Sequence, residues 1–314
     1  MKIIPPSFEI LDDLDRQSLA VRIEACGRIC YKSEDKITES SAEPFIEKII
    51  RHGHNSVTEM AVLTLRVTAP DEAVINGFLA VIPRYLLIDR TGGLDLLITG
   101  SVRGFRELYL FHPDVPMVQA ISAYLAGRHP LFYVDLTPAG GWPRQGRGFE
   151  MAKVPLAEVE QLPGELLARH RHVAVKFIVN RAVTHEIVRH RPCSYLQESQ
   201  RYCRYSESKF DNQVTFIRPL FFEEGSPEFR LWEEAMRETE KLYLQLLETT
   251  TPQAARTVLP NSCKTELIAY ANLSEWRHIF RLRTSAAAEP SMREVMIPLL
   301  KEFGKRYPAV FAGL

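Results

Sequence analysis

The sequence predicts an α+β protein, and three observations support that class. Apolar residues recur at helical spacing within residues 15–31, which is typical of an amphipathic helix. They alternate with polar residues along residues 61–68 and again along 173–179, which is typical of strands with one buried face. The chain has 314 residues, 46% of them hydrophobic, so it is long enough to bury a sizeable core.

The first third of the chain contains two predicted helices and a strand. Within residues 15–31, the positions that share one helix face are apolar. The run Ser41-Ala-Glu-Pro opens a second helix, which we expect to end near Gly53. Residues 61–68 then form a strand, with these side chains on one face: Leu63, Leu65 and Val67.

A mixed stretch of about 100 residues separates the two predicted strands. We interpret it as an insertion at about 69–171 within a single domain of residues 1–314. Its loop at 137–148 is rich in Gly and Pro and is expected to be exposed. A short strand is expected at Leu131–Leu136, and helices are expected near 71–82, 103–110, 116–126 and 155–170.

The strand at 173–179 leads into a helix expected at about 180–191. A further strand is expected at 214–217. The rest of the chain is predicted to be helical, with segments near 227–249, 252–258, 261–271, 274–283 and 290–304.

Composition excludes several functional classes. There are 39 basic and 39 acidic residues, so no global field attracts nucleic acid or anionic lipid. No apolar run approaches the roughly 20 residues that a membrane-spanning helix needs. Five scattered cysteines form neither a disulfide framework nor a CxxC metal pair. These features predict a soluble cytoplasmic protein with reduced thiols.

Residues 189–202 carry the densest group of chemically active side chains, in the sequence Arg-His-Arg-Pro-Cys-Ser-Tyr-Leu-Gln-Glu-Ser-Gln-Arg-Tyr. A helix cannot place three consecutive residues on one face, and Pro192 disfavours helix at Arg191. A turn of this composition is able to surround an extended anion, because Arg forks hold phosphate with two hydrogen bonds. Charge alone leaves a solvated basic helix end as an equal alternative.

Two further clusters carry polar groups. One is the turn Gly53-His54-Asn55-Ser56-Val57-Thr58-Glu59. The other is C-terminal and contains Arg256, Asn272, Trp276-Arg277-His278 and Arg283. Separate basic clusters in a neutral protein suggest a ligand with several phosphates.

The spacing of these groups resembles the flavin-dependent thymidylate synthase (ThyX) family. Its motif is Arg-His-Arg, seven residues, Ser, any residue, Arg, which this chain has from Arg189 to Ser199 and Arg201. Flanking segments are also similar: Cys26-Gly-Arg-Ile-Cys-Tyr-Lys-Ser, Gly53-His54, His185-Glu-Ile-Val, Pro252-Gln-Ala-Ala-Arg-Thr-Val-Leu-Pro and Asn272-Leu-Ser-Glu-Trp-Arg-His-Ile-Phe-Arg-Leu-Arg283. The resemblance covers residues 15–68 and 172–304.

The resemblance implies a ThyX-like fold, with a mixed sheet flanked by helices and the large insertion between two strands. It implies reductive methylation of dUMP to dTMP, with tightly bound FAD and with NADPH and methylenetetrahydrofolate as co-substrates. Family members are homotetramers whose sites combine several subunits. A membrane or nucleic-acid partner is not expected.

The resemblance also implies a role for each matching residue. Arg283 and His54 would be catalytic. The dUMP site would comprise Glu186, Gln197, Ser199, Arg201, Arg256 and Arg283. The FAD site would comprise His54, Ser56, Glu59, Arg189, His190, Arg191, Asn272 and His278.

Four positions depart from the family pattern, three of them on the flavin side: Met60, Leu196, Ser274 and Glu289. They leave two other hypotheses open. One is a divergent paralogue that binds a pyrimidine nucleotide with altered or no methylation. The other is a nucleotide-binding or regulatory protein whose insertion contacts a partner.

No metal site is predicted. His185 and His190 are five residues apart, about 140° around a helix, which does not fit the HExxH arrangement. The pairs His52/His54 and His170/His172 lack a third ligand and are interpreted as solvated. Cys193 and Cys203 are interpreted as spectator thiols, and Trp276 and Phe280 as core residues.

Overall fold

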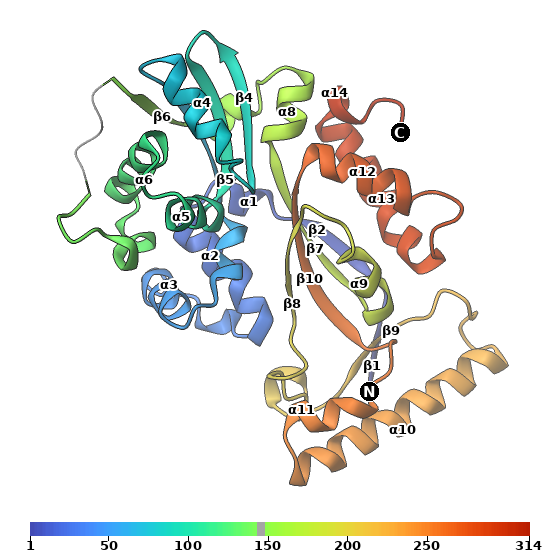
Figure 1. Cartoon of the computed structure of the whole chain (residues 1–314). Helices are drawn as coiled ribbons and strands as arrows, with labels where there is room; N and C mark the ends of the chain where they lie inside the picture. Colours follow the sequence, from blue (N-terminus) through green and yellow to red (C-terminus); the bar gives the residue numbers. More distant parts are fainter. Residues whose placement is uncertain (143–147) are drawn as a thin grey trace. The chain divides into compact units, whose positions relative to one another are not determined.

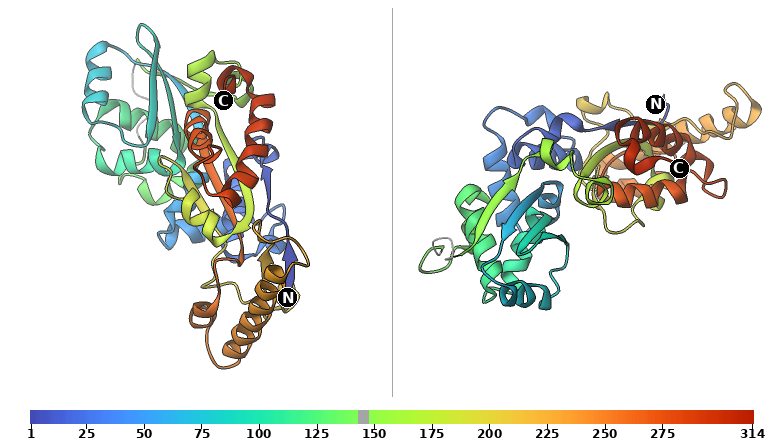
Figure 2. Two further views of the ribbon diagram at one scale, coloured as in Figure 1. Left: turned by 90° about the vertical axis from the view of Figure 1, so that its right-hand side faces the viewer. Right: turned by 90° about the horizontal axis from the view of Figure 1, so that it is seen from above.

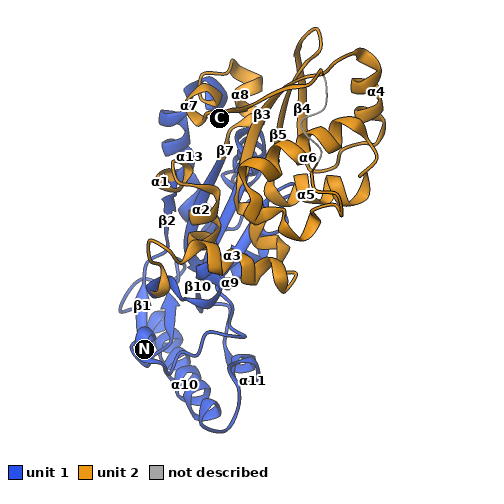
Figure 3. Ribbon diagram, turned by 90° about the vertical axis from the view of Figure 1, so that its left-hand side faces the viewer, with its two compact units in different colours: residues 1–11, 27–35, 173–314 blue, residues 12–26, 36–172 orange. Residues whose placement is uncertain are grey.

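The computed structural model describes residues 1–142 and 148–314, which form two compact units (Figures 1 and 3). Unit 1 comprises residues 1–11, 27–35 and 173–314, and unit 2 comprises 12–26 and 36–172. Residues 143–147, in the predicted 137–148 loop, lie outside the described part. The interpretation of one domain with an insertion at about 69–171 stays a prediction.

The elements follow the chain in an irregular mixture of helices and strands (Figure 1). The strands are β1 Lys2–Ile4, β2 Ser7–Ile10, β3 Val62–Thr68, β4 Leu86–Gly92, β5 Asp95–Ser101, β6 Glu150–Val154, β7 His172–Asn180, β8 Ser194–Gln197, β9 Thr215–Ile217 and β10 Lys264–Asn272. The α-helices are α1 Asp12–Asp15, α2 Leu19–Arg28, α3 Ala42–Arg51, α4 Glu72–Ala80, α5 Val102–Phe111, α6 Pro116–Arg128, α7 Leu156–Val159, α8 Gly164–His170, α9 Arg181–Ile187, α10 Pro227–Thr249, α11 Pro252–Ala255, α12 Leu273–Arg283, α13 Pro290–Arg306 and α14 Pro308–Phe311. Short 3-10 helices are η1 Ile29–Tyr31, η2 Glu34–Lys36, η3 Asn55–Met60, η4 Pro130–Phe132, η5 Val134–Leu136, η6 Ser208–Phe210 and η7 Arg256–Val258.

Unit 1 is built on a four-stranded sheet of order β2-β7-β10-β8, with β8 antiparallel to β10. A separate pair, β1 and β9, runs parallel. Helices α12 and α13 lie side by side against the larger sheet (Figure 2). Trp276 and Phe280 stack at 5.6 Å between ring centroids and are fully buried, which confirms them as core residues. The core of unit 1 therefore lies beneath the helix that carries Arg283.

Strand β10 contradicts the prediction of a helix at 261–271. All seven residues between its two ends are buried, so both faces of the strand are covered. A strand buried on both faces loses the polar–apolar alternation that would reveal it. Its side chains are therefore indistinguishable by periodicity from those of a buried helix.

The helix predicted at about 180–191 ends earlier, at Ile187. It begins as expected after β7, where the Asn180 side chain accepts a hydrogen bond from the Val183 amide at 2.9 Å. At its other end, the Tyr195 hydroxyl donates to the carbonyls of Ile187 (2.8 Å) and His190 (3.2 Å). Carbonyls satisfied in this way need no further helical turn, so Arg189, His190 and Arg191 lie in a loop.

Unit 2 contains an antiparallel sheet of order β4-β5-β3-β6. The predicted strand at 61–68 is confirmed as β3, whose Leu63, Leu65 and Val67 are buried. Strands β4, β5 and β6 were missed, although Gly93 and Leu94 form a tight turn between β4 and β5. Strand β5, like β10, has a run of consecutive buried residues, so its sequence lacks the apolar–polar alternation that would have indicated a strand.

Two further expectations for this stretch are wrong. The strand expected at Leu131–Leu136 is instead η4 and η5, because Pro130 fixes a turn and local i to i+3 hydrogen bonds follow. The helix expected at 155–170 is broken into α7 and α8. Pro163 disfavours helix at the preceding residue and supplies no backbone N–H, so α7 ends before it and a new helix, α8, begins directly after it.

His170 is not solvated, contrary to the sequence interpretation. It is 2% exposed and lies in a chain of polar side chains that ties the sheet of unit 2 to α8. Its Nδ1 lies 2.8 Å from the Thr99 hydroxyl and its Nε2 lies 2.9 Å from Asp89. Thr99 in turn contacts the Thr64 hydroxyl at 2.7 Å. Burial lowers the pKa of His170, so the ring serves as a neutral structural link.

The α+β class is confirmed, since helices and several sheets both contribute to the structure. The predicted helices at 71–82, 103–110, 116–126, 227–249, 274–283 and 290–304 correspond to α4, α5, α6, α10, α12 and α13. Within residues 1–142 and 148–314, no helix combines the length and apolarity needed to cross a bilayer.

Candidate functional site

Arg283 is the centre of a group of side chains in unit 1. It lies at the C-terminal end of α12 and is held by the end of α9 and the loop that follows. Its Nη1 pairs with the Glu186 carboxylate at 2.6 Å, and its Nη2 donates to the Glu186 carbonyl at 3.1 Å. Its Nε donates to Nε2 of His190 at 2.9 Å. Two sequence motifs almost 100 residues apart therefore meet at one guanidinium.

The protonation state of His190 follows from this contact. An Arg side chain is always a donor, so Nε2 of His190 must be an unprotonated acceptor. Burial, followed by the charge of Arg283 and the nearby His278, lowers the pKa of His190 to about 4. The ring is therefore neutral near pH 7, as the hydrogen bond requires.

Gln197, at the end of β8, is positioned by two buried hydroxyls. Its amide nitrogen donates to Thr184 of α9 (3.1 Å) and to Thr265 of β10 (3.2 Å). Both donor positions of the amide are thus used within unit 1, and the amide oxygen remains as the group available to a ligand.

Ser199 and Arg201 lie in a loop whose backbone is firmly anchored. The Glu198 and Ser199 amides donate to the carbonyls of Glu266 (2.8 Å) and Cys30 (3.0 Å). Glu198, 2% exposed, accepts from Lys264 at 2.8 Å and from the Tyr205 hydroxyl at 2.9 Å. By contrast, Arg201 is exposed, so the anchored loop presents a guanidinium to solvent.

Arg256 belongs to the same end of the site as Arg201. The Arg201 Nε lies 3.4 Å from Oε1 of Gln253, on α11, and Arg256 begins η7 directly after that helix. Strand β8, whose four residues span about 13 Å at roughly 3.3 Å per residue, lies along the chain between this end and the His190 loop that contacts Arg283. The predicted nucleotide residues of unit 1 thus form two groups along one strand.

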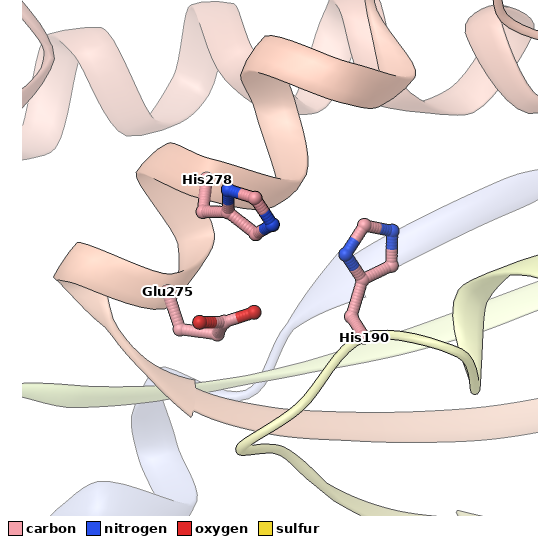
Figure 4. Close-up of side chains that lie close together, drawn as sticks. All are labelled: His190, Glu275 and His278. Carbon is pink, nitrogen blue, oxygen red and sulfur yellow. The ribbon is translucent and has the colours of Figure 1, made fainter.

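Five predicted flavin residues lie at the N-cap of α12, on α12 itself or on the loop after α9. Asn272 caps α12, its side-chain oxygen accepting from the Glu275 amide at 2.8 Å. Figure 4 shows His190 on its loop opposite His278, with Glu275 below His278 on the same helix. The two imidazole rings are 5.9 Å apart. Arg189 and Arg191 flank His190 and are exposed.

The other predicted flavin residues belong to unit 2. His54 and Ser56 are exposed at the start of η3. Glu59 is partly buried and pairs with Arg103 of α5 at 2.6 Å, while Arg103 also contacts Glu107 at 2.6 Å. An Arg of the predicted insertion therefore fixes a residue of the predicted flavin set.

Three of the four residues that depart from the family pattern have structural roles. Met60 is fully buried, and Leu196 is buried where β8 pairs with Ile268 of β10. Glu289 is the N-cap of α13, where its carboxylate accepts from the Met292 amide at 2.8 Å. Its charge is therefore partly offset by the helix N-terminus.

A comparison with protein-family models identifies the family of the chain. The model of the Thy1 family, described as thymidylate synthase complementing protein, matches residues 14–75 and 167–309, about two thirds of the chain. The chain belongs to the Thy1 family. The matched ranges contain every predicted site residue of both units, and residues 76–166 are outside them.

Several flavin-dependent thymidylate synthases are similar to this Thy1 chain. Those of Pyrococcus abyssi and Pyrococcus furiosus are each 37% identical over 128 residues, which cover 40% of this chain and 52% of the relative. That of Mycobacterium tuberculosis (strain ATCC 25177 / H37Ra) is 31% identical over 154 residues, which cover 45% of this chain and 62% of the relative. The chain thus spans about half the length of the Pyrococcus relatives that it matches.

Several residues that contact members of the candidate site were not predicted from the sequence. Thr184 and Thr265 orient Gln197, and Tyr195 holds the loop that carries His190. Glu275 could have been found, because it precedes His278 by three residues on a predicted helix and so shares its face. The buried threonines carry no such signal, since their partners are distant in sequence.

Proposed function

We propose that the chain is a flavin-dependent thymidylate synthase that converts dUMP to dTMP. The contact of Arg283 with both Glu186 and His190 carries this proposal, because it joins the Arg-His-Arg motif to the C-terminal Arg at one point. Methylenetetrahydrofolate would donate the carbon and NADPH the reducing equivalents. The ThyX-like fold, the homotetramer and a cytoplasmic location belong to the same proposal.

Arg283 would stabilise charge on the pyrimidine. Three of its five N–H groups are engaged by Glu186 and His190, and the other two have no partner among the described residues. Held on three sides, the guanidinium needs no reorganisation when negative charge develops on the ring as C5 becomes nucleophilic. Glu186 therefore acts by positioning Arg283.

The phosphate of dUMP would bind at the other end of β8. The Ser199 hydroxyl provides a neutral donor and the exposed Arg201 guanidinium a charged one. Arg256, directly after α11, would also line the dUMP site. The Gln197 amide oxygen, at the end of β8, would accept from the nucleotide. The separation of the groups fits the proposal that neighbouring subunits complete each site.

The donor set around α12 fits FAD. Arg189 and Arg191 are exposed cations suited to its phosphates, and the neutral His190 and the Asn272 amide suit the polar edge of a flavin. His278 would join them. The FAD assignment of His54, Ser56 and Glu59 of unit 2 rests on the family resemblance alone, and His54 would also be catalytic. Bound flavin would supply the hydride and carbon transfer that no side chain can perform.

The proposal predicts a flavin spectrum for the purified full-length chain. After incubation with FAD and removal of free cofactor, the protein should be yellow, and anaerobic NADPH should bleach it. A protein that binds dUMP but takes up no FAD would instead support the divergent paralogue. Glu275, which places a carboxylate beside His190 and His278, is the observation that favours that second candidate.

Cysteine chemistry is not expected to contribute. Burial raises the pKa of both Cys193 and Cys203 to about 12, so neither thiol ionises appreciably at neutral pH. The variant Cys193→Ala/Cys203→Ala should keep its turnover number within about twofold, with a thermal melt to verify folding. Loss of turnover in a folded double variant would point to a thiol nucleophile.

A further inference from the structure

The space between His190, Glu275 and His278 has the donor set of a transition-metal site. One potential ligand atom from each residue lies within 4.8 Å of the other two. Two ligands of one ion at about 2.0–2.2 Å from it are at most about 4.4 Å apart, so only a small closure is needed. His278 is exposed and Glu275 partly buried, which leaves these side chains room to move.

The three groups point toward one another from two elements. His190 comes from the loop after α9, while Glu275 and His278 are three residues apart on α12 and share one face of that helix (Figure 4). Arg277 is about 200° around the helix from Glu275, so it projects away from the site. The charge of Arg283 is compensated by its contact with Glu186 at 2.6 Å.

An unsatisfied oxygen in this group calls for an additional partner. Oε1 of Glu275 is buried and finds no hydrogen-bond partner among the described residues. A buried carboxylate oxygen without a donor is costly, and a cation is one way of satisfying it. This observation is independent of the clustering of the two histidines.

We infer that His190, Glu275 and His278 bind a divalent transition metal of the class of Zn²⁺ or Co²⁺. Two imidazoles and a carboxylate suit such an ion and leave coordination positions open to water. The alkaline-earth cations are not favoured, since they prefer oxygen ligands. The inference concerns metal binding by the flavin-free chain and does not rest on the proposed function.

Metal binding competes with Arg283 for His190. Because Nε2 accepts from Arg283, the neutral ring carries its proton on Nδ1, the nitrogen that remains to coordinate the ion. Coordination displaces that proton to water, and Nε2 then takes up a proton and loses the hydrogen bond from Arg283. The occupied site therefore releases Arg283 from one of its three contacts.

Titration of the flavin-free, EDTA-treated and dialysed full-length chain with Co²⁺ alone tests the inference through the visible absorption of bound Co²⁺. We expect saturable binding of one ion. Its affinity should fall by more than about tenfold in Glu275→Gln and in His278→Ala, because losing a metal ligand lowers the affinity at least as much as losing a residue that is hydrogen-bonded to a ligand. His52→Ala is the matched control, because His52 is an exposed histidine outside the group, and its affinity should not change. Zn²⁺ should displace the Co²⁺ signal.

Arg283→Met supplies a second test, because it removes the competing donor and keeps an unbranched side chain. Co²⁺ should bind this variant more tightly than the parent chain. The inference is overturned if neither the parent nor Arg283→Met gives a saturable Co²⁺ spectrum. It is equally overturned if the spectrum persists at full affinity in both Glu275→Gln and His278→Ala.

Discussion

The variant Arg283→Ala is expected to lower the turnover number for dTMP formation by about 100- to 1,000-fold, the usual effect of removing a preorganised donor from a developing negative charge. The loss should fall mainly on kcat, because the guanidinium would interact most strongly with the transition state. The structure favours a large effect, since Glu186 and His190 fix this side chain before any ligand binds. Steady-state kinetics with saturating methylenetetrahydrofolate and NADPH would measure it.

Arg237→Ala is the matched control for this substitution. Arg237 is 67% exposed on α10 and pairs only with Glu233 among the described residues, so its loss should leave kcat unchanged. Glu186→Gln should reproduce part of the loss, because it weakens the pairing that orients Arg283. A folded Arg283→Ala variant with the parent turnover number would exclude Arg283 from the reaction.

Arg201→Ala is expected to weaken dUMP binding by roughly 10- to 100-fold, which corresponds to one charge-assisted hydrogen bond. The exposed guanidinium lies on a loop anchored by Glu198 and by the Ser199 amide, so the substitution should not disturb the fold. Isothermal titration of dUMP against the full-length chain would give the dissociation constants.

Deoxyuridine separates a phosphate contact from a general loss of affinity. It lacks the phosphate, so the parent chain and Arg201→Ala should bind it equally weakly. If Arg201→Ala bound dUMP as tightly as the parent chain, the assignment of Arg201 to the phosphate would be wrong. Equal losses for dUMP and deoxyuridine would also contradict it, because they would indicate a distorted site.

The fold was predictable where one face of an element is exposed. Helices α4 and α12 mix buried positions with partly or fully exposed ones, and strand β3 alternates apolar and polar residue types, so their periods are visible in the sequence. Strand β10 was mistaken for a helix because seven consecutive residues are buried. The end of α9 was misplaced because the Tyr195 hydroxyl, eight residues beyond Ile187, satisfies a helix carbonyl.

The segment that carries the candidate site could be singled out from the sequence, but the contacts between its residues could not. The spacing of Arg189, Ser199 and Arg201 along the chain is enough to single out this segment. The contact between Arg283 and His190 spans 93 residues, and no local pattern encodes a contact of that range. The Arg103 contact to Glu59 was equally hidden, because its two members lie on either side of β3 in the sequence.

A turnover assay with the purified chain, FAD, NADPH, methylenetetrahydrofolate and dUMP tests the central claim most directly. The account predicts dTMP that accumulates in proportion to NADPH oxidised, with no product when dUMP or the folate is omitted. Flavin reduction by NADPH without any dTMP, in a chain that binds dUMP, would contradict it.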